Sequence, residues 1–114
     1  MSVVHSIFAM RCGDTWQFSG PLNDADGNPL SLVGATLTWK LDSIDGKTNY
    51  ITLTLNNGIE ITNSSTATVQ YGPSVAQTSP LTPGTYYDTL QVTLQDGETY
   101  TMVEGYINAL PAEQ

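Results

Sequence analysis

Apolar and polar residues alternate with a period of two along most of this chain. Over 35–42 every odd position is apolar and every even position is polar, and a similar alternation returns over 51–55, 67–71 and 86–95. Because successive side chains of a β-strand point to opposite faces of a sheet, each run predicts a strand with one face on a core.

Turn signals separate these runs. Asp45-Gly46, Asn57-Gly58 and Asp96-Gly97 are typical of tight turns between antiparallel strands. Segment 72–83 contains three prolines and allows at most one helical turn, around 75–76. Further strands are predicted in the ranges 3–10, 15–19, 59–61 and 98–109.

The predicted fold is all-β, an immunoglobulin-like antiparallel β-sandwich of seven or eight strands. Sixteen threonines, with many valines, isoleucines and tyrosines, favour this class because β-branched and aromatic side chains suit a pleated surface. At 114 residues the chain corresponds to a single domain, residues 1–114, in which 111–114 form a loose tail.

The stretch from Leu81 to Tyr86 resembles the tyrosine corner of immunoglobulin-like sandwiches. There a tyrosine at the start of a late strand hydrogen-bonds back to the preceding loop, and Leu81, Gly84 and Tyr86 are the matching positions. Asp88 follows two residues later with the parity of the core face, where a buried carboxylate needs hydrogen-bond partners. We expect it at the rim of the sandwich, bonded to backbone or hydroxyl groups.

The charge balance excludes two classes of partner. Eleven acidic residues face only Arg11, Lys40 and Lys47, for a formal net charge of −8. Nucleic acids and anionic membranes both require clustered cations, so neither is expected as a partner. The acidity instead favours solubility or a basic partner.

No constellation of residues predicts catalysis, a cofactor or a metal. His5 and Cys12 are the only residues of their types and fall on opposite faces of a regular strand, so they form neither a catalytic pair nor a zinc site. The sequence Asp24-Ala-Asp-Gly-Asn28 lacks the spacing of a calcium loop and predicts a turn. The chain is therefore not expected to be an enzyme.

Several segments together resemble a family of small bacteriophage virion domains, the N-terminal domain of the baseplate upper protein family. The resemblance covers about residues 11–110 and is carried by turns and core positions. These segments are Gly13–Trp16, Asp26–Ala35, Gly58–Ile61, Leu81–Tyr86, Leu90–Gly97 and Gly105–Ile107.

What the resemblance implies is a non-enzymatic phage virion structural protein located in the virion. It would join tail, baseplate or fibre components, with capsid decoration as the alternative. Its partners would be other virion proteins, and it would be oligomeric. The N-terminal strand is the candidate intersubunit contact or an ordinary edge strand, and its apolar residues are Val3, Val4, Ile7, Phe8 and Met10. A carbohydrate-binding module is the alternative from another class, because Tyr50 and Tyr87 are expected at the surface while Trp39 and Tyr86 enter the core.

Overall fold

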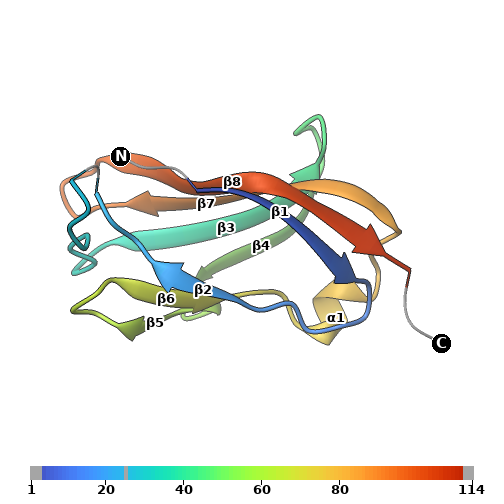
Figure 1. The fold of residues 1–114 in the computed structure, drawn as a ribbon, viewed down its shortest axis with the longest axis horizontal. Coiled ribbons are helices and arrows are strands. Elements are labelled where there is room, and N and C mark those ends of the chain that lie inside the picture. The colour runs from blue at the N-terminus through green and yellow to red at the C-terminus, as the bar shows by residue number, and fades with distance from the viewer. Residues whose placement is uncertain (1–3, 25, 112–114) are drawn as a thin grey trace.

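The computed structural model describes residues 4–24 and 26–111, with only the backbone described for 4–8. This part of the chain forms eight strands and one short helix (Figure 1). The strands are β1 (Val4–Arg11), β2 (Phe18–Pro21), β3 (Thr36–Ser43), β4 (Asn49–Leu55), β5 (Gly58–Asn63), β6 (Thr68–Tyr71), β7 (Gly84–Thr93) and β8 (Thr99–Leu110). Helix α1 (Val75–Thr78) is the single helical turn expected in the proline-rich segment, and no described helix is long and apolar enough to span a bilayer.

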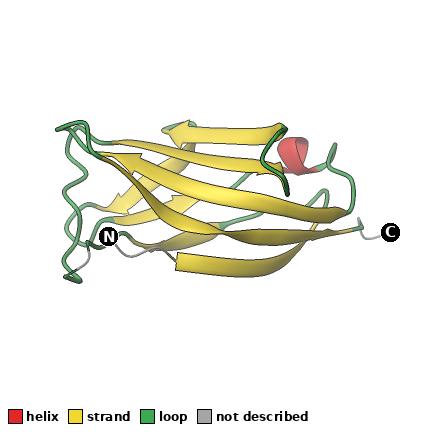
Figure 2. Cartoon of the chain, turned by 90° about the horizontal axis from the view of Figure 1, so that it is seen from above, coloured by secondary structure: helices red, strands yellow, loops and turns green. Residues whose placement is uncertain are grey.

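The strands form one curled sheet in the order β1-β8-β7-β3-β4-β5-β6-β2. The strands from β1 to β4 in this order make one layer, and β5, β6 and β2 make the other (Figures 1 and 2). Among the described residues the ladder between the two layers consists of two residue pairs, Thr54 with Gly58 and Leu55 with Ile59. The all-β sandwich is thus confirmed.

The prediction of a purely antiparallel sandwich needs one correction. Strand β1 runs parallel to β8, and β4 runs parallel to β5, so the sheet is mixed. The alternation of side chains decides which face of a strand is buried but not which strand lies beside it, so the pattern could not distinguish these two pairings.

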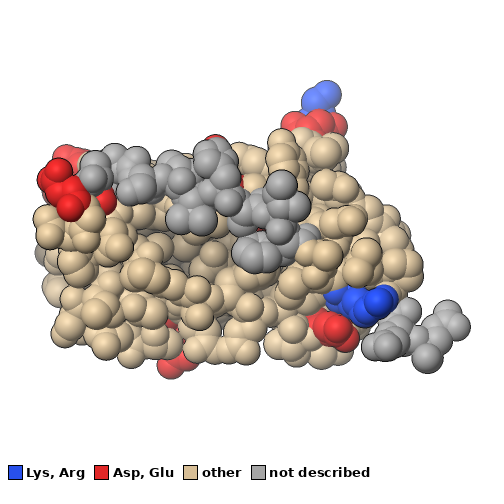
Figure 3. Space-filling view, in the orientation of Figure 1, with Lys and Arg blue, Asp and Glu red and all other residues tan. Residues whose placement is uncertain are grey.

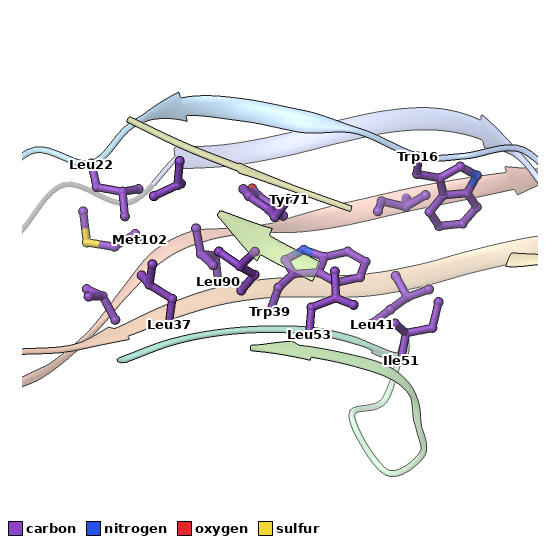
Figure 4. Close-up of a cluster of buried hydrophobic side chains, with 14 of the residues drawn as sticks. Trp16, Leu22, Leu37, Trp39, Leu41, Ile51, Leu53, Tyr71, Leu90 and Met102 are labelled. Carbon is purple, nitrogen blue, oxygen red and sulfur yellow. The ribbon is translucent and has the colours of Figure 1, made fainter. Parts of the chain in front are cut away.

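The core is centred on Trp39 of β3, whose side chain has no exposed surface. Phe18 of β2 and Tyr71 of β6 pack around it, with ring centroids 6.1 Å from the Trp39 ring in both cases and 5.5 Å from each other. Figure 4 shows Trp39 and Tyr71 in the middle of the cluster, Trp16 at one end, and Leu22 and Met102 at the other. Residues from both layers therefore share one apolar core.

The segment before β2 departs from the predicted strand at 15–19, since β2 starts only at Phe18. The Trp16 indole donates to the Arg11 carbonyl at 2.7 Å, and the Trp16 backbone N–H donates to the Pro73 carbonyl at 3.1 Å. A Cβ on Gly72 would lie 1.8 Å from the Trp16 carbonyl oxygen, so the two backbones approach each other closely. Trp16 is held by these contacts outside any strand.

At the start of β7 the Tyr86 hydroxyl donates a hydrogen bond to the Thr82 carbonyl at 2.6 Å. This is the hydrogen bond that defines a tyrosine corner. The edge of the exposed Tyr50 ring packs on Tyr86, with centroids 5.1 Å apart and planes at 87°. Both contacts fix the loop that leads into β7.

Replacing Tyr86 by Phe removes the hydroxyl while keeping the ring in the core. The Thr82 carbonyl then loses its bond, so we expect the free energy of unfolding to fall by about 1 kcal/mol. Urea denaturation of the purified chain measures the difference. Tyr50→Phe is the matched control, because no hydrogen bond joins the Tyr50 hydroxyl to a described residue, and it should leave stability nearly unchanged. Equal effects of the two variants would show that the corner bond adds nothing.

Candidate functional site

Three loops that are distant in sequence meet at one end of the sandwich, on the left in Figure 1. They are the β2–β3 loop (22–35), the β5–β6 turn (64–67) and the β7–β8 turn (94–98), which we call the loop end. The Leu22 N–H donates to the Ala67 carbonyl at 2.9 Å and ties the first loop to the second. Gly34 lies so close to Gln95 that a Cβ there would be 3.0 Å from that side chain.

Side-chain oxygens of Asp and Asn hold each loop in shape. Asp24 Oδ1 accepts the N–H groups of Asp26 and Asn28, Asn63 Oδ1 accepts that of Ser65, and Asp96 Oδ1 accepts that of Glu98. Such bonds fix a turn locally and favour these residue types in loops. The turn predicted at Asp24–Asn28 is confirmed.

Buried leucines anchor the β2–β3 loop to the core beneath it. Leu22, Leu30 and Leu32 are 4–7% exposed, and the Leu30 N–H donates to the Leu22 carbonyl at 3.0 Å. The loop end is therefore a preformed surface, the state in which a binding site loses least conformational entropy when a ligand arrives.

A depression of about 380 Å³ lies between the β2–β3 loop and strand β5 with its following turn. Its lining residues are Ser31, Leu32, Val33, Ile61, Ser64 and Ser65. Val33 is 76% exposed, the largest exposed fraction among the large hydrophobic side chains described. The exposed Val33 thus lies on an anchored loop, beside a hollow that is also lined by serine hydroxyls.

The loop end carries negative charge only. Asp24, Asp26, Asp96 and Glu98 lie in its loops, and no Lys or Arg occurs in 22–35, 61–67 or 94–98. On the face seen in Figure 3 the coloured charged atoms at the left end are acidic, and the blue atoms lie in the right half. The charged side chains of this end therefore give it a negative electrostatic potential.

A second hollow of about 480 Å³ lies against β5 and β6, near the β4–β5 turn. Its aromatic residues, Trp16 and Tyr71, are 1% and 8% exposed and belong to the core. The groups in this hollow that a ligand could contact are polar side chains such as Gln17, Gln70 and Glu60. It lacks the exposed apolar side chain of the loop end.

The residues considered for chemistry do not come together. Cys12 is a buried free thiol, as expected of a small apolar residue, and the side chain of His5 lies outside what the structure describes. In the described ranges no group of three or more His, Cys, Asp or Glu residues could hold a metal ion.

Asp88 is buried in the core, with 2% of its surface exposed, and not at the rim. Its Oδ2 accepts a hydrogen bond from the Trp39 indole at 3.4 Å, a donor outside the expected backbone and hydroxyl groups, and its Oδ1 has no partner among the described residues. Burial raises the pKa of the Asp88 carboxyl above its ordinary value, while hydrogen bonds from the Trp39 indole and its own backbone N–H oppose this. Burial, with a smaller contribution from Asp88, also raises the pKa of Tyr71.

The candidate intersubunit residues lie on an edge strand of the chain's own sheet. Strand β1, which includes Val4, Ile7, Phe8 and Met10, pairs with β8 along its whole length. Met10 packs against the core. Val3 lies outside the described residues, as do 112–114 of the predicted tail.

The sequence pattern did not predict the exposure of Val33. Val33 lies in a turn between β2 and β3, where the alternation of a strand does not determine which side chains are buried. The proximity of Ser64 and Ser65 has no local signal, because it depends on how the two layers pack.

No protein-family model and no curated protein matches this chain. Among solved structures the chain is similar to the crystal structure of CopC from Methylosinus trichosporium OB3b. The sequence identity is 11%, the TM-score is 0.51, and the match covers 94% of this chain and 88% of the CopC chain. At this identity the similarity establishes the β-sandwich fold and no more.

This comparison contradicts the predicted function. The matching fold is that of CopC, and the comparisons bring no link to a phage. The prediction of a virion structural protein, with its alternatives of capsid decoration and carbohydrate binding, is therefore wrong. The family resemblance, the virion location and the virion partners have no test in these comparisons and stay predictions.

Asp88→Asn should change how stability depends on pH. Because the folded pKa of Asp88 is raised, its contribution to stability is full below the unfolded pKa of about 3.9 and is lost as pH rises through the folded value. The asparagine cannot ionise, so we expect the variant to keep its stability over that pH range. At neutral pH the variant should therefore be more stable than the original chain.

Thermal unfolding of both chains from pH 3 to pH 8 measures this difference. Glu60→Gln removes an exposed carboxyl of β5 and serves as the control. If Asp88→Asn and the original chain lose stability in parallel as pH rises, the raised pKa of Asp88 is refuted.

Proposed function

We propose that this protein is a non-enzymatic protein-binding module whose loop end binds a basic protein surface. The observation that carries the proposal is the exposed Val33 beside the depression in an anchored, wholly acidic set of loops. Neither nucleic acid nor membrane is part of the proposal, because the chain has only three cationic residues.

The location of the surface supports this function. Loops held at one end of a rigid sandwich are where immunoglobulin-like domains commonly bind their partners. The buried leucines and the side-chain bonds within each turn fix the three loops before a partner arrives. Little entropy is then lost on binding.

The chemistry of the surface indicates what kind of partner fits. The depression of about 380 Å³ has room for one or two side chains. Val33 and Ile61 supply apolar contacts and three serines supply hydroxyls. The surrounding carboxylates favour an apolar side chain flanked by Lys or Arg.

A peptide with that chemistry provides the test. Acetyl-Lys-Lys-Leu-Lys-Lys-amide is titrated into the isotope-labelled full chain while backbone amide resonances are followed by NMR. We expect saturable shifts confined to 22–35, 61–67 and 94–98. Rising salt should weaken binding, because the carboxylates are at the surface.

Two valines give a matched pair of variants. Val33→Ser removes apolar surface at the depression and should weaken binding about fivefold. Val75→Ser makes the same change on α1, at the opposite end, where the valine is 48% exposed, and should have no effect. Shifts spread over the whole surface, or equal losses in the two variants, would refute the loop end as the binding site.

A further inference from the structure

We propose that two copies of this chain form a dimer by antiparallel pairing of their β1 strands. This interface is separate from the loop end and does not depend on the function proposed for it. The argument rests on the backbone of β1 and on its sequence.

Strand β1 leaves a long backbone edge unpaired. It spans eight residues, and within the described part of the chain its one sheet neighbour is β8. The N–H and C=O groups on its other side form a row that accepts a further strand. Such an edge is a binding surface unless the sequence protects it.

The sequence of β1 carries none of the usual protection. Positions 4–10 contain neither a charged residue nor a proline, and the first charge comes at Arg11. The other edge of the sheet is β2, which has only four residues and ends at Pro21. Short length and proline both discourage edge pairing, so β1 is the edge that is open to a partner.

A second copy fits this edge by symmetry. In a sheet that continues through a two-fold axis, paired residues must face the same side, so their numbers must have the same parity. A register that pairs Val4 with Met10 and His5 with Ala9 meets this condition. It centres the axis on Ile7 and uses all seven uncharged residues of the strand.

Electrostatics then sets the conditions under which the dimer forms. Each copy carries a net charge of −8, so the two copies repel each other over long distances. Salt screens this repulsion and should tighten the dimer, whereas it should weaken the binding of a basic peptide at the loop end. The opposite salt responses separate the two proposals experimentally.

Sedimentation velocity of the full chain over a range of concentrations measures the association. We expect a monomer–dimer equilibrium that strengthens with salt. Ala9→Lys should raise the dissociation constant on the order of tenfold, because it places a lysine at the edge twice in each dimer. Thr85→Lys makes the same charge change on β7, two strands away from the edge, and should leave the dimer intact.

Cysteine cross-linking tests the register in a Cys12→Ala background. Two Ile7→Cys chains meet at the two-fold axis, with Cα atoms about 4.5–5.5 Å apart, and should form a disulfide with oxidised glutathione. Two Ala9→Cys residues lie about 13 Å apart and should not. A chain that stays monomeric up to about 1 mM at high salt, or equal cross-linking at both positions, would overturn the proposal.

Discussion

The structure depends on the burial of Trp39 between two layers that share few backbone hydrogen bonds. Where β4 meets β5 the layers are joined by two residue pairs, so packing rather than the ladder holds them together. Trp39 contacts Phe18 and Tyr71 of the opposite layer, and its own side chain has no exposed surface. Burial of such aromatic side chains contributes several kcal/mol, which makes this cluster the main constraint on how the layers sit.

Asp88 shows what the core tolerates around Trp39. Immunoglobulin domains with a disulfide have their second cysteine two residues after the corner tyrosine, and here that position is an aspartate. The Trp39 indole bonds one carboxyl oxygen, while burial raises the pKa of the group and favours its neutral form. Trp39 therefore has two roles. It fills the apolar core, and its indole N–H donates the hydrogen bond that lowers the cost of burying the Asp88 carboxyl.

Local pattern predicted the strands well and their arrangement less well. The alternation over 35–42 corresponds closely to β3, and the same parity placed Asp88 on the core face. The pattern could not predict the parallel partner of β1 or the displacement of Trp16 out of β2, since both depend on contacts with distant residues such as Leu110 and Gly72. The loop end needed tertiary structure for the same reason, because Val33 lies in a turn where strand alternation does not apply.

The sandwich fold shared with CopC fixes the core and leaves the loops and sheet edges free to differ. In this chain the loop end and the β1 edge differ in charge. The loop end is wholly acidic, whereas β1 is uncharged from 4 to 10. A net charge of −8 favours a basic partner at the first surface and opposes a second copy at the second, so ionic strength shifts the balance between them. In these two proposals the same excess of carboxylates favours a basic partner at the loop end and opposes pairing at the open edge of β1.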